Sequence, residues 1–105
     1  MDRRVKREEF EEVLNTEFRI PVENSDPLKL ELFEITEGLN TETQEQFALH
    51  FRGPRDLPFP QAIRLMEHET LGTLKLFLVP LAREEDGMIY EAAFNRFIKQ
   101  DEEES

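Results

Sequence analysis

The stretch Leu74–Leu81 reads Leu-Lys-Leu-Phe-Leu-Val-Pro-Leu and is the longest apolar run in the chain, interrupted only by Lys75 and Pro80. A strand that is covered on both faces reads as a near-continuous apolar run, whereas a half-exposed strand alternates. We therefore expect Leu74–Leu81 to be the central strand of a small β domain, buried on both faces. Because proline lacks a backbone N–H, we expect Pro80 to end this strand.

Several other segments have the pattern of strands. The clearest is Gln46–Arg52, in which Phe47, Leu49 and Phe51 alternate with residues that we expect to point outward. The remaining predicted strands are Glu17–Val22, Leu28–Thr36, Gln61–His68 and Met88–Phe97. The pair Asp86-Gly87 is a strong hairpin signal and predicts that the last strand lies beside the central one. Gln61–His68 is expected on its other side.

The sequence also predicts local irregularities. Pro21 indicates that Glu17–Val22 is an edge strand. Within Leu28–Thr36 the apolar positions change parity at Phe33, which predicts a β-bulge or a strand covered on both faces near its end. Asn24–Pro27 is a dense turn signal, and the polar segment Glu37–Glu45 has the composition of an exposed loop.

A short helix is predicted over Lys6–Leu14, where Phe10, Val13 and Leu14 share one face. A helix of this length is not stable alone in water, so we expect it to plug an open end of the sheet or to cover an exposed flank. We interpret residues 6–99 as one domain and expect residues 1–5 and 100–105 to be disordered tails, the second of them strongly acidic. The predicted fold is mainly β: about six antiparallel strands in a small barrel or sandwich, with one short N-terminal helix.

Composition excludes several classes of function. The net charge of −11 repels nucleic-acid phosphates and anionic membranes, so neither is an expected partner. The absence of cysteine excludes disulfides, a thiol nucleophile and thiolate metal sites. No apolar run approaches the roughly 18 residues of a membrane span, and no signal peptide is recognisable, so a cytoplasmic location is expected. No cofactor motif is present.

A series of short motifs appears in order along the chain: Phe47-Ala48-Leu49, Phe51-Arg52-Gly53-Pro54, Gln61, Glu67-His68, Leu71-Gly72, Leu76–Pro80, Asp86-Gly87 and Tyr90–Asn95. In this order, and over Lys6 to Asn95, the chain resembles a bacterial family of small domains of unknown function. Ala62 stands where that family has Gly, Arg64 where it tends to have an aromatic residue, and Asn15 where it favours Gly. The resemblance implies no known activity. Genes of the family often accompany phage-tail-like proteins, so it implies an accessory or assembly role.

Three groups of residues are candidates for a functional site. In Arg52-Gly53-Pro54 we favour a structural role, with Gly53 supplying an unusual φ angle and Arg52 pairing with an acid. The spacing of the two histidines, His50 and His68, does not favour a metal site, and His68 is expected to make a structural hydrogen bond at a strand end.

Tyr90 and Glu91 have the residue types of an acid and a base. We favour instead a half-buried aromatic ring for Tyr90 and a cross-strand ion pair of Glu91 with Arg64 or Lys75. No catalytic, metal or cofactor residue is assigned.

The sequence therefore predicts a non-enzymatic domain that binds another protein, as an assembly accessory in a phage-tail-like system. Its partner would meet an edge strand such as Glu17–Val22, or the loop between Arg52 and Gln61. The candidate interaction residues are Arg52, Gly53, Pro54, Phe59, Gln61, His68, Tyr90 and Glu91. The alternative is a small-molecule-binding module or a cryptic enzyme that uses the barrel mouth near His68, Tyr90 and Glu91. The alternative needs a concave pocket with converging polar groups, whereas an assembly domain needs a solid core and a flat apolar patch or an open edge.

Overall fold

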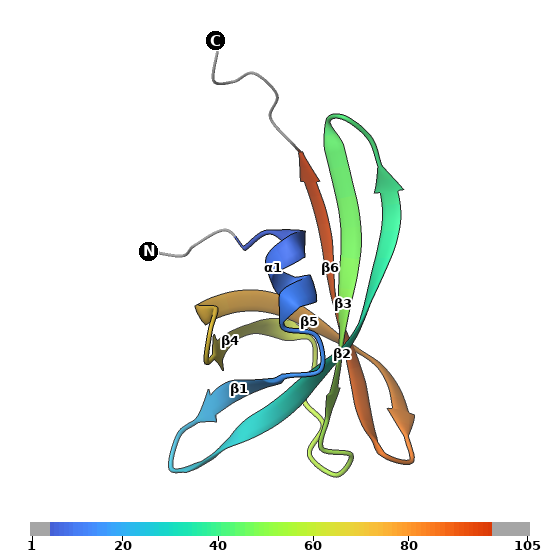
Figure 1. Cartoon of the computed structure of the whole chain (residues 1–105). Helices are drawn as coiled ribbons and strands as arrows, with labels where there is room; N and C mark the ends of the chain where they lie inside the picture. Colours follow the sequence, from blue (N-terminus) through green and yellow to red (C-terminus); the bar gives the residue numbers. More distant parts are fainter. Residues whose placement is uncertain (1–4, 98–105) are drawn as a thin grey trace.

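Six antiparallel strands close into a ring in the order β1-β2-β3-β6-β5-β4 (Figure 1). The structure is a computed structural model that describes residues 5–97. Its elements are α1 (Arg7–Glu12), β1 (Glu17–Val22), β2 (Ser25–Asn40), β3 (Gln44–Gly53), β4 (Ala62–His68), β5 (Gly72–Glu84) and β6 (Gly87–Phe97). The mainly-β prediction is confirmed, and of the two predicted forms the chain adopts the barrel. The predicted tails at 1–4 and 100–105 lie outside the described residues, whereas Val5 is buried in the core.

The position of β5 in the sheet is as predicted. It pairs with β4 from Ala62↔Leu78 to His68↔Gly72 and with β6 from Val79↔Glu91 to Glu84↔Gly87. The two-residue turn before Gly87 makes the β5–β6 hairpin that Asp86-Gly87 predicts. Three consecutive strands therefore form an antiparallel meander with β5 in its centre.

The predicted burial of both faces of β5 was wrong. Leu74, Leu76 and Leu78 are buried, but Phe77 is 50% exposed, because a closed barrel has only one interior and strand side chains alternate. Pro80 does not end the strand either, since β5 continues to Glu84. The pairing with β6 instead shifts register between Pro80 and Ala82, a bulge that accommodates the missing N–H.

The predicted edge strand and the predicted loop also need correction. Strand β1 is not a free edge, because Arg19 pairs with Glu67 of β4 and thereby closes the ring. The turn before β2 is shorter than predicted: it is limited to residues 23–24, with Asn24 in the left-handed conformation at a φ of 61°. Much of the predicted loop Glu37–Glu45 is paired strand, with Glu37 opposite Phe47 and Asn40 opposite Glu45.

The phase change at Phe33 does mark a bulge, as predicted. The pairing of β2 with β3 shifts register between Leu32 and Glu34. Beyond this point β2, β3 and β6 continue together as a twisted three-stranded arm, visible at the top of Figure 1. The arm lengthens the molecule to 49 × 28 × 23 Å.

Large side chains fill the barrel interior. The fully buried ones are Phe10, Phe18, Leu30, Leu32, Leu49, Phe51, Met66, Leu78 and Tyr90. They come from α1 and from all six strands, so the core is shared by the whole ring. Phe18 and Phe51 meet edge to face with ring centroids 5.2 Å apart, a favourable aromatic geometry.

Helix α1 covers the open side between the arm and the rest of the barrel (Figure 1). Phe10 is 1% exposed and packs against Phe47 and Phe94, with ring centroids 6.2 and 5.7 Å away. The carboxylate of Glu9 accepts a hydrogen bond from the Lys6 N–H at 2.9 Å and so caps the first turn. Arg7 reaches Glu37 of β2 at 2.9 Å. The expectation that a short helix must dock on the sheet is met mainly by Phe10.

We predict that Phe10→Ala lowers the free energy of unfolding by about 3–5 kcal/mol, because it removes the ring that joins α1 to the arm. The matched control is Leu14→Ala just after the helix. Leu14 is 37% exposed, and its truncation should cost less than about 1 kcal/mol. Urea denaturation followed by circular dichroism measures both values. Equal losses for the two variants would contradict this role of α1.

Candidate functional site

His68 is buried at the end of β4 and holds three segments together. Its side chain Nδ1 accepts the backbone N–H groups of Thr70 at 2.9 Å and Leu71 at 3.1 Å. Nδ1 is therefore unprotonated, and Nε2 carries the proton toward Thr16 Oγ1, 2.8 Å away. Thr16 Oγ1 donates in turn to the Val13 carbonyl at 2.6 Å. These bonds tie the β4–β5 turn to the segment between α1 and β1, which confirms the predicted structural role.

Burial lowers the pKa of His68 below its ordinary value of 6.5. The nearby charge of Glu69 raises this pKa and the charge of Arg19 lowers it, so burial remains the largest cause. A neutral ring is also what the hydrogen bonds require, since a protonated Nδ1 could not accept the two backbone N–H groups. His68 is thus a structural residue of the folded state.

Close packing holds Arg52-Gly53-Pro54, where the loop between β3 and β4 begins. The Arg52 guanidinium lies 4.3 Å from the ring centroid of Phe33 and pairs with Glu31 at 3.5 Å, as the predicted acid partner requires. Gly53 does not have the unusual φ angle that we predicted. A Cβ at this position would lie 3.0 Å from Leu30 Cδ2 and 3.4 Å from Tyr90 Cε1, a tight fit that requires a small shift of these side chains. Position 53 is therefore distinguished by close packing and not by a turn conformation.

Tyr90 lies in the core beneath the loop that follows β3, fully buried where a half-buried ring was expected. Its hydroxyl accepts the Phe59 N–H at 3.2 Å, and the two rings stack with centroids 4.1 Å apart. The Arg64 guanidinium lies over the Phe59 ring, 4.5 Å from its centroid. Burial raises the pKa of Tyr90 above its ordinary value of 10.0. Phe59 is thus held against Tyr90 at the end of this loop.

Glu91 lies on the outside of the barrel and pairs with a residue that the sequence pattern did not indicate. Its Oε2 is 3.0 Å from His50 Nε2, and His50 Nδ1 is 3.3 Å from Glu34. The predicted pairing with Arg64 or Lys75 was wrong. Arg64 is on β4, which β5 separates from β6, and on β5 the residue opposite Glu91 is Val79 and not Lys75. The row Glu34, His50 and Glu91 crosses three neighbouring strands.

The eight predicted interaction residues therefore do not form one surface. Gly53, His68 and Tyr90 are buried, so their side chains are not presented to a partner. Gln61 is exposed after the proline-rich loop, and Glu91 is half-buried on the outer face. The residues of the predicted barrel-mouth site, His68, Tyr90 and Glu91, contact different neighbours and do not converge on one cavity.

An apolar patch on the outer face of β4 and β5 was missed by sequence reasoning. Ile63 and Phe77 are directly opposed in the pairing and are 70% and 50% exposed. Leu65, on the same face of β4, is 42% exposed. The signal was present in the sequence: Ile63 and Leu65 share a parity that Met66 does not, and Phe77 has the parity opposite to Leu76 and Leu78. We call Ile63, Leu65 and Phe77 the β4–β5 outer face.

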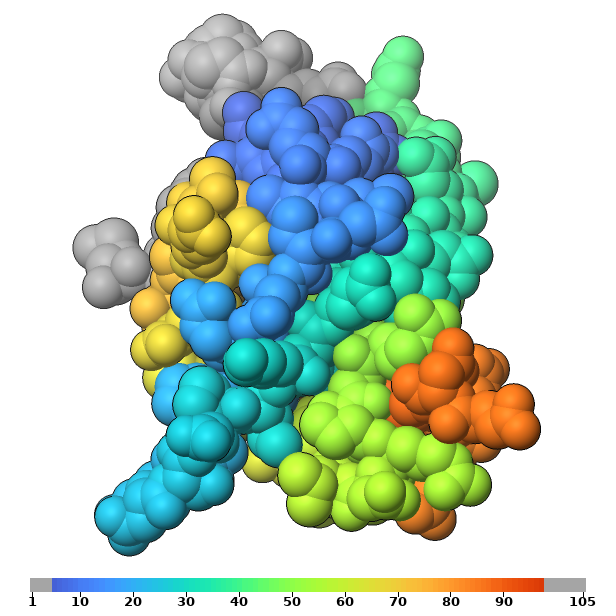
Figure 2. Space-filling view, turned by 60° about the horizontal axis from the view of Figure 1, so that its bottom comes forward, coloured from blue at the N-terminus to red at the C-terminus, as the bar shows by residue number. Residues whose placement is uncertain are grey.

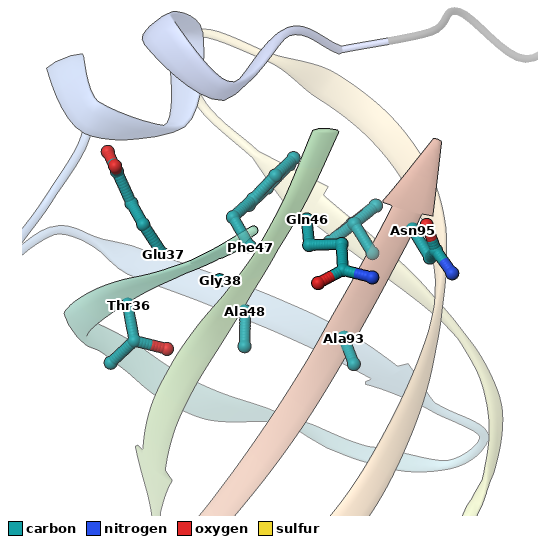
Figure 3. A pocket seen from close by; sticks show the side chains of 9 residues that line it. Thr36, Glu37, Gly38, Gln46, Phe47, Ala48, Ala93 and Asn95 are labelled. Carbon is teal, nitrogen blue, oxygen red and sulfur yellow. The ribbon is translucent and has the colours of Figure 1, made fainter. Parts of the chain in front are cut away.

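A shallow cavity of about 360 Å³ lies on the arm (Figure 3). Ala48 and Ala93 are paired across β3 and β6, with Thr36 of β2 alongside, and these small side chains leave the surface hollow. Gln46 and Asn95 flank it, and Phe47, which also lines it, extends toward the helix. The cavity brings together no group of titratable side chains suited to catalysis.

Within residues 5–97, no cluster of three or more histidine, cysteine or acidic side chains is arranged to hold a metal ion. Across the same residues, no helix combines the length and the apolar character needed to cross a bilayer. The described residues form a barrel with a filled core and an apolar patch on its outside.

Comparison with protein families gives a match over most of the chain. The model of the family described as "Domain of unknown function (DUF6916)" matches residues 5–94. No curated protein and no solved structure matches the chain.

We predict that stability falls in acid through His68. Because its folded pKa lies below the unfolded value of 6.5, the unfolded state binds more protons at low pH. The stabilising contribution is therefore complete above pH 6.5 and is lost as the pH falls through the folded pKa. His68→Gln should be less stable at neutral pH by about 1–3 kcal/mol. The Gln amide reaches the position of Nε2, so the N–H groups of Thr70 and Leu71 lose the acceptor that Nδ1 provides.

The test is urea denaturation of both chains between about pH 7.5 and pH 5, the range in which histidine titrates. Acidic residues titrate in both proteins, so the difference between their profiles reports His68. The wild type should lose more stability than His68→Gln over this range. Parallel profiles would show that His68 is not the buried neutral group described here.

Proposed function

This chain belongs to the DUF6916 family, and we propose that it is a non-enzymatic protein–protein interaction domain. The observation that carries the proposal is the β4–β5 outer face. Ile63 and Phe77 form an exposed cross-strand apolar pair on a sheet whose opposite face already fills the core. Contiguous exposed apolar side chains on a folded surface are typical of protein interaction sites.

The surroundings of this face resemble an interface rim. Leu65 is paired with Lys75, and the next pair on the same face is Glu67 with Thr73. Arg19 of β1 lies opposite Glu67 on the other side of β4. An apolar centre with charged residues at its margin is the usual anatomy of a protein interface. The charged margin supports a partner that is itself a folded or extended protein segment.

The filled interior favours this function over the barrel-mouth alternative. A small-molecule site needs a concave pocket in which a few polar groups converge. His68 and Tyr90 use their polar atoms to hold backbone N–H groups and the segment before β1, and Glu91 faces His50 outside the barrel. The more specific proposal, an accessory role in a phage-tail-like assembly, rests on the family resemblance and on the same face.

We predict that Ile63→Glu abolishes partner binding without unfolding the chain, because the side chain is 70% exposed and the new charge must be desolvated in the interface. The matched control is Leu39→Glu at the tip of the arm, where the leucine is 59% exposed. Tagged wild-type and variant chains are expressed in the native host, and co-purifying proteins are quantified by mass spectrometry. A specific partner should fall by about tenfold or more with Ile63→Glu and stay unchanged with Leu39→Glu.

Two outcomes would contradict the proposal. One is recovery of the same partners at the same level with Ile63→Glu. The other is the absence of any stable partner together with a thermal shift on addition of a metabolite, which would favour the small-molecule alternative.

A further inference from the structure

Strand β3 leaves β2 at a proline. The last pair of this ladder at that end is Glu31↔Arg52, so continuing the register by two residues would place Lys29 opposite Pro54. Proline has no N–H to donate to the Lys29 carbonyl, and the chain turns away into the loop that precedes β4. Residues Ser25–Lys29 of β2 consequently pair with β1 alone.

The backbone of Lys29 points to the side that β3 has vacated. Leu32 directs its N–H and C=O toward the β1 side, where they bond Thr16 and Asn15 at 3.1 and 2.6 Å. Since successive residues of a strand alternate in direction, Leu30 and Leu28 face β1 and Lys29 faces away from it. In the part of the chain that the structure describes, no turn or loop backbone group bonds to Lys29.

A groove of about 510 Å³ occupies this place. One wall is the edge Ser25–Lys29, and the other is formed by Pro54, Leu57, Pro58 and Phe59. Figure 2 shows the hollow between the projecting tip of the β1–β2 hairpin and the lime-coloured loop. Phe59 is fixed by its stacking on Tyr90 and by its N–H bond to the Tyr90 hydroxyl, so this wall is preformed.

We propose that this groove binds an extended peptide segment of another protein, which adds to β2 as an extra strand beside Ser25–Lys29. A peptide backbone carries an N–H and a C=O at one residue, which is the complement that Lys29 offers across an antiparallel hydrogen-bonded pair. The apolar residues Leu57 and Phe59 receive an apolar side chain of the segment. Neither a lipid chain nor a sugar presents a backbone N–H and C=O together with an apolar side chain.

Charge specifies the segment further. Asp26 lines the groove, is exposed and has no ion-pair partner among residues 5–97. The chain as a whole carries a net charge of −11, which attracts cationic segments and repels a second copy of itself. Lys29 is the other charged residue that lines the groove, so the preference for a basic residue is local to Asp26. The occupant is therefore an extended peptide that combines apolar residues with a basic residue beside Asp26. This site is additional to the β4–β5 outer face, and either can fail without the other.

The test begins with a displayed library of random peptides of about ten residues, long enough to form one strand, selected on the purified chain. Enriched sequences should combine apolar and basic residues. One enriched peptide is then synthesised, and its affinity is measured by fluorescence anisotropy. Hydrogen exchange by NMR should show slower exchange of the Lys29 amide in the complex.

Matched variants locate the site. Leu57→Glu should weaken the peptide by about tenfold or more, while Leu39→Glu, at a leucine of similar exposure, leaves it unchanged. Asp26→Lys should weaken it as well, and Glu12→Lys on the exposed helix should not. The proposal is overturned if no peptide is enriched above the starting library. It is equally overturned if a bound peptide leaves Lys29 exchange unaltered, or if its affinity depends on Ile63→Glu and not on Leu57→Glu.

Discussion

A closed barrel has one interior, and the two-residue period of a strand admits only every second side chain to it. This constraint determines how the apolar residues of the chain are distributed. Leu74, Leu76 and Leu78 fill the core, so Phe77 must stand on the outside, where β4 places Ile63 directly opposite it. The apolar face on which the proposed interaction function rests thus follows from the closure of the barrel, which leaves one face of an apolar strand outside.

The ring is closed where the short strands meet, and it is held there by polar contacts. Strands β1 and β4 share the pair Arg19↔Glu67. Close by, His68 at the end of β4 bonds Thr16 just before β1, and its ring packs 4.4 Å from the Phe18 centroid. The adjoining helix α1 packs Phe10 against Phe47 and Phe94 of the arm. His68 and Phe10 therefore supply contacts that backbone pairing between the strands does not provide.

Much of the fold follows from local pattern. The alternation of Phe47, Leu49 and Phe51, the bulge at Phe33 and the hairpin at Gly87 are local signals, and the structure has all three. The extension of β2 beyond Thr36 was not predicted, because a polar ladder on a sheet that projects from the core has no apolar periodicity to mark it.

The features that escaped prediction depend on which strands become neighbours. An apolar run such as Leu74–Leu81 fits a strand covered on both faces and also a strand with one exposed apolar face. The partner of Glu91 is His50 because β6 lies beside β3, and no local pattern contains that information. The vacated edge at Lys29 requires the β2–β3 register, which only the folded chain reveals.

The most direct test of this account is the solvent accessibility of single side chains in the dilute, free protein. A soluble paramagnetic agent broadens the NMR signals of protons that it can approach. The account predicts strong broadening for Ile63 and Phe77. It predicts weak broadening for Leu76 and Leu78, which flank Phe77 in the sequence and point to the opposite face of β5. Protection of Phe77 equal to that of Leu78 would contradict it, since β5 would then be covered on both faces and the outer face would not be free to bind a partner.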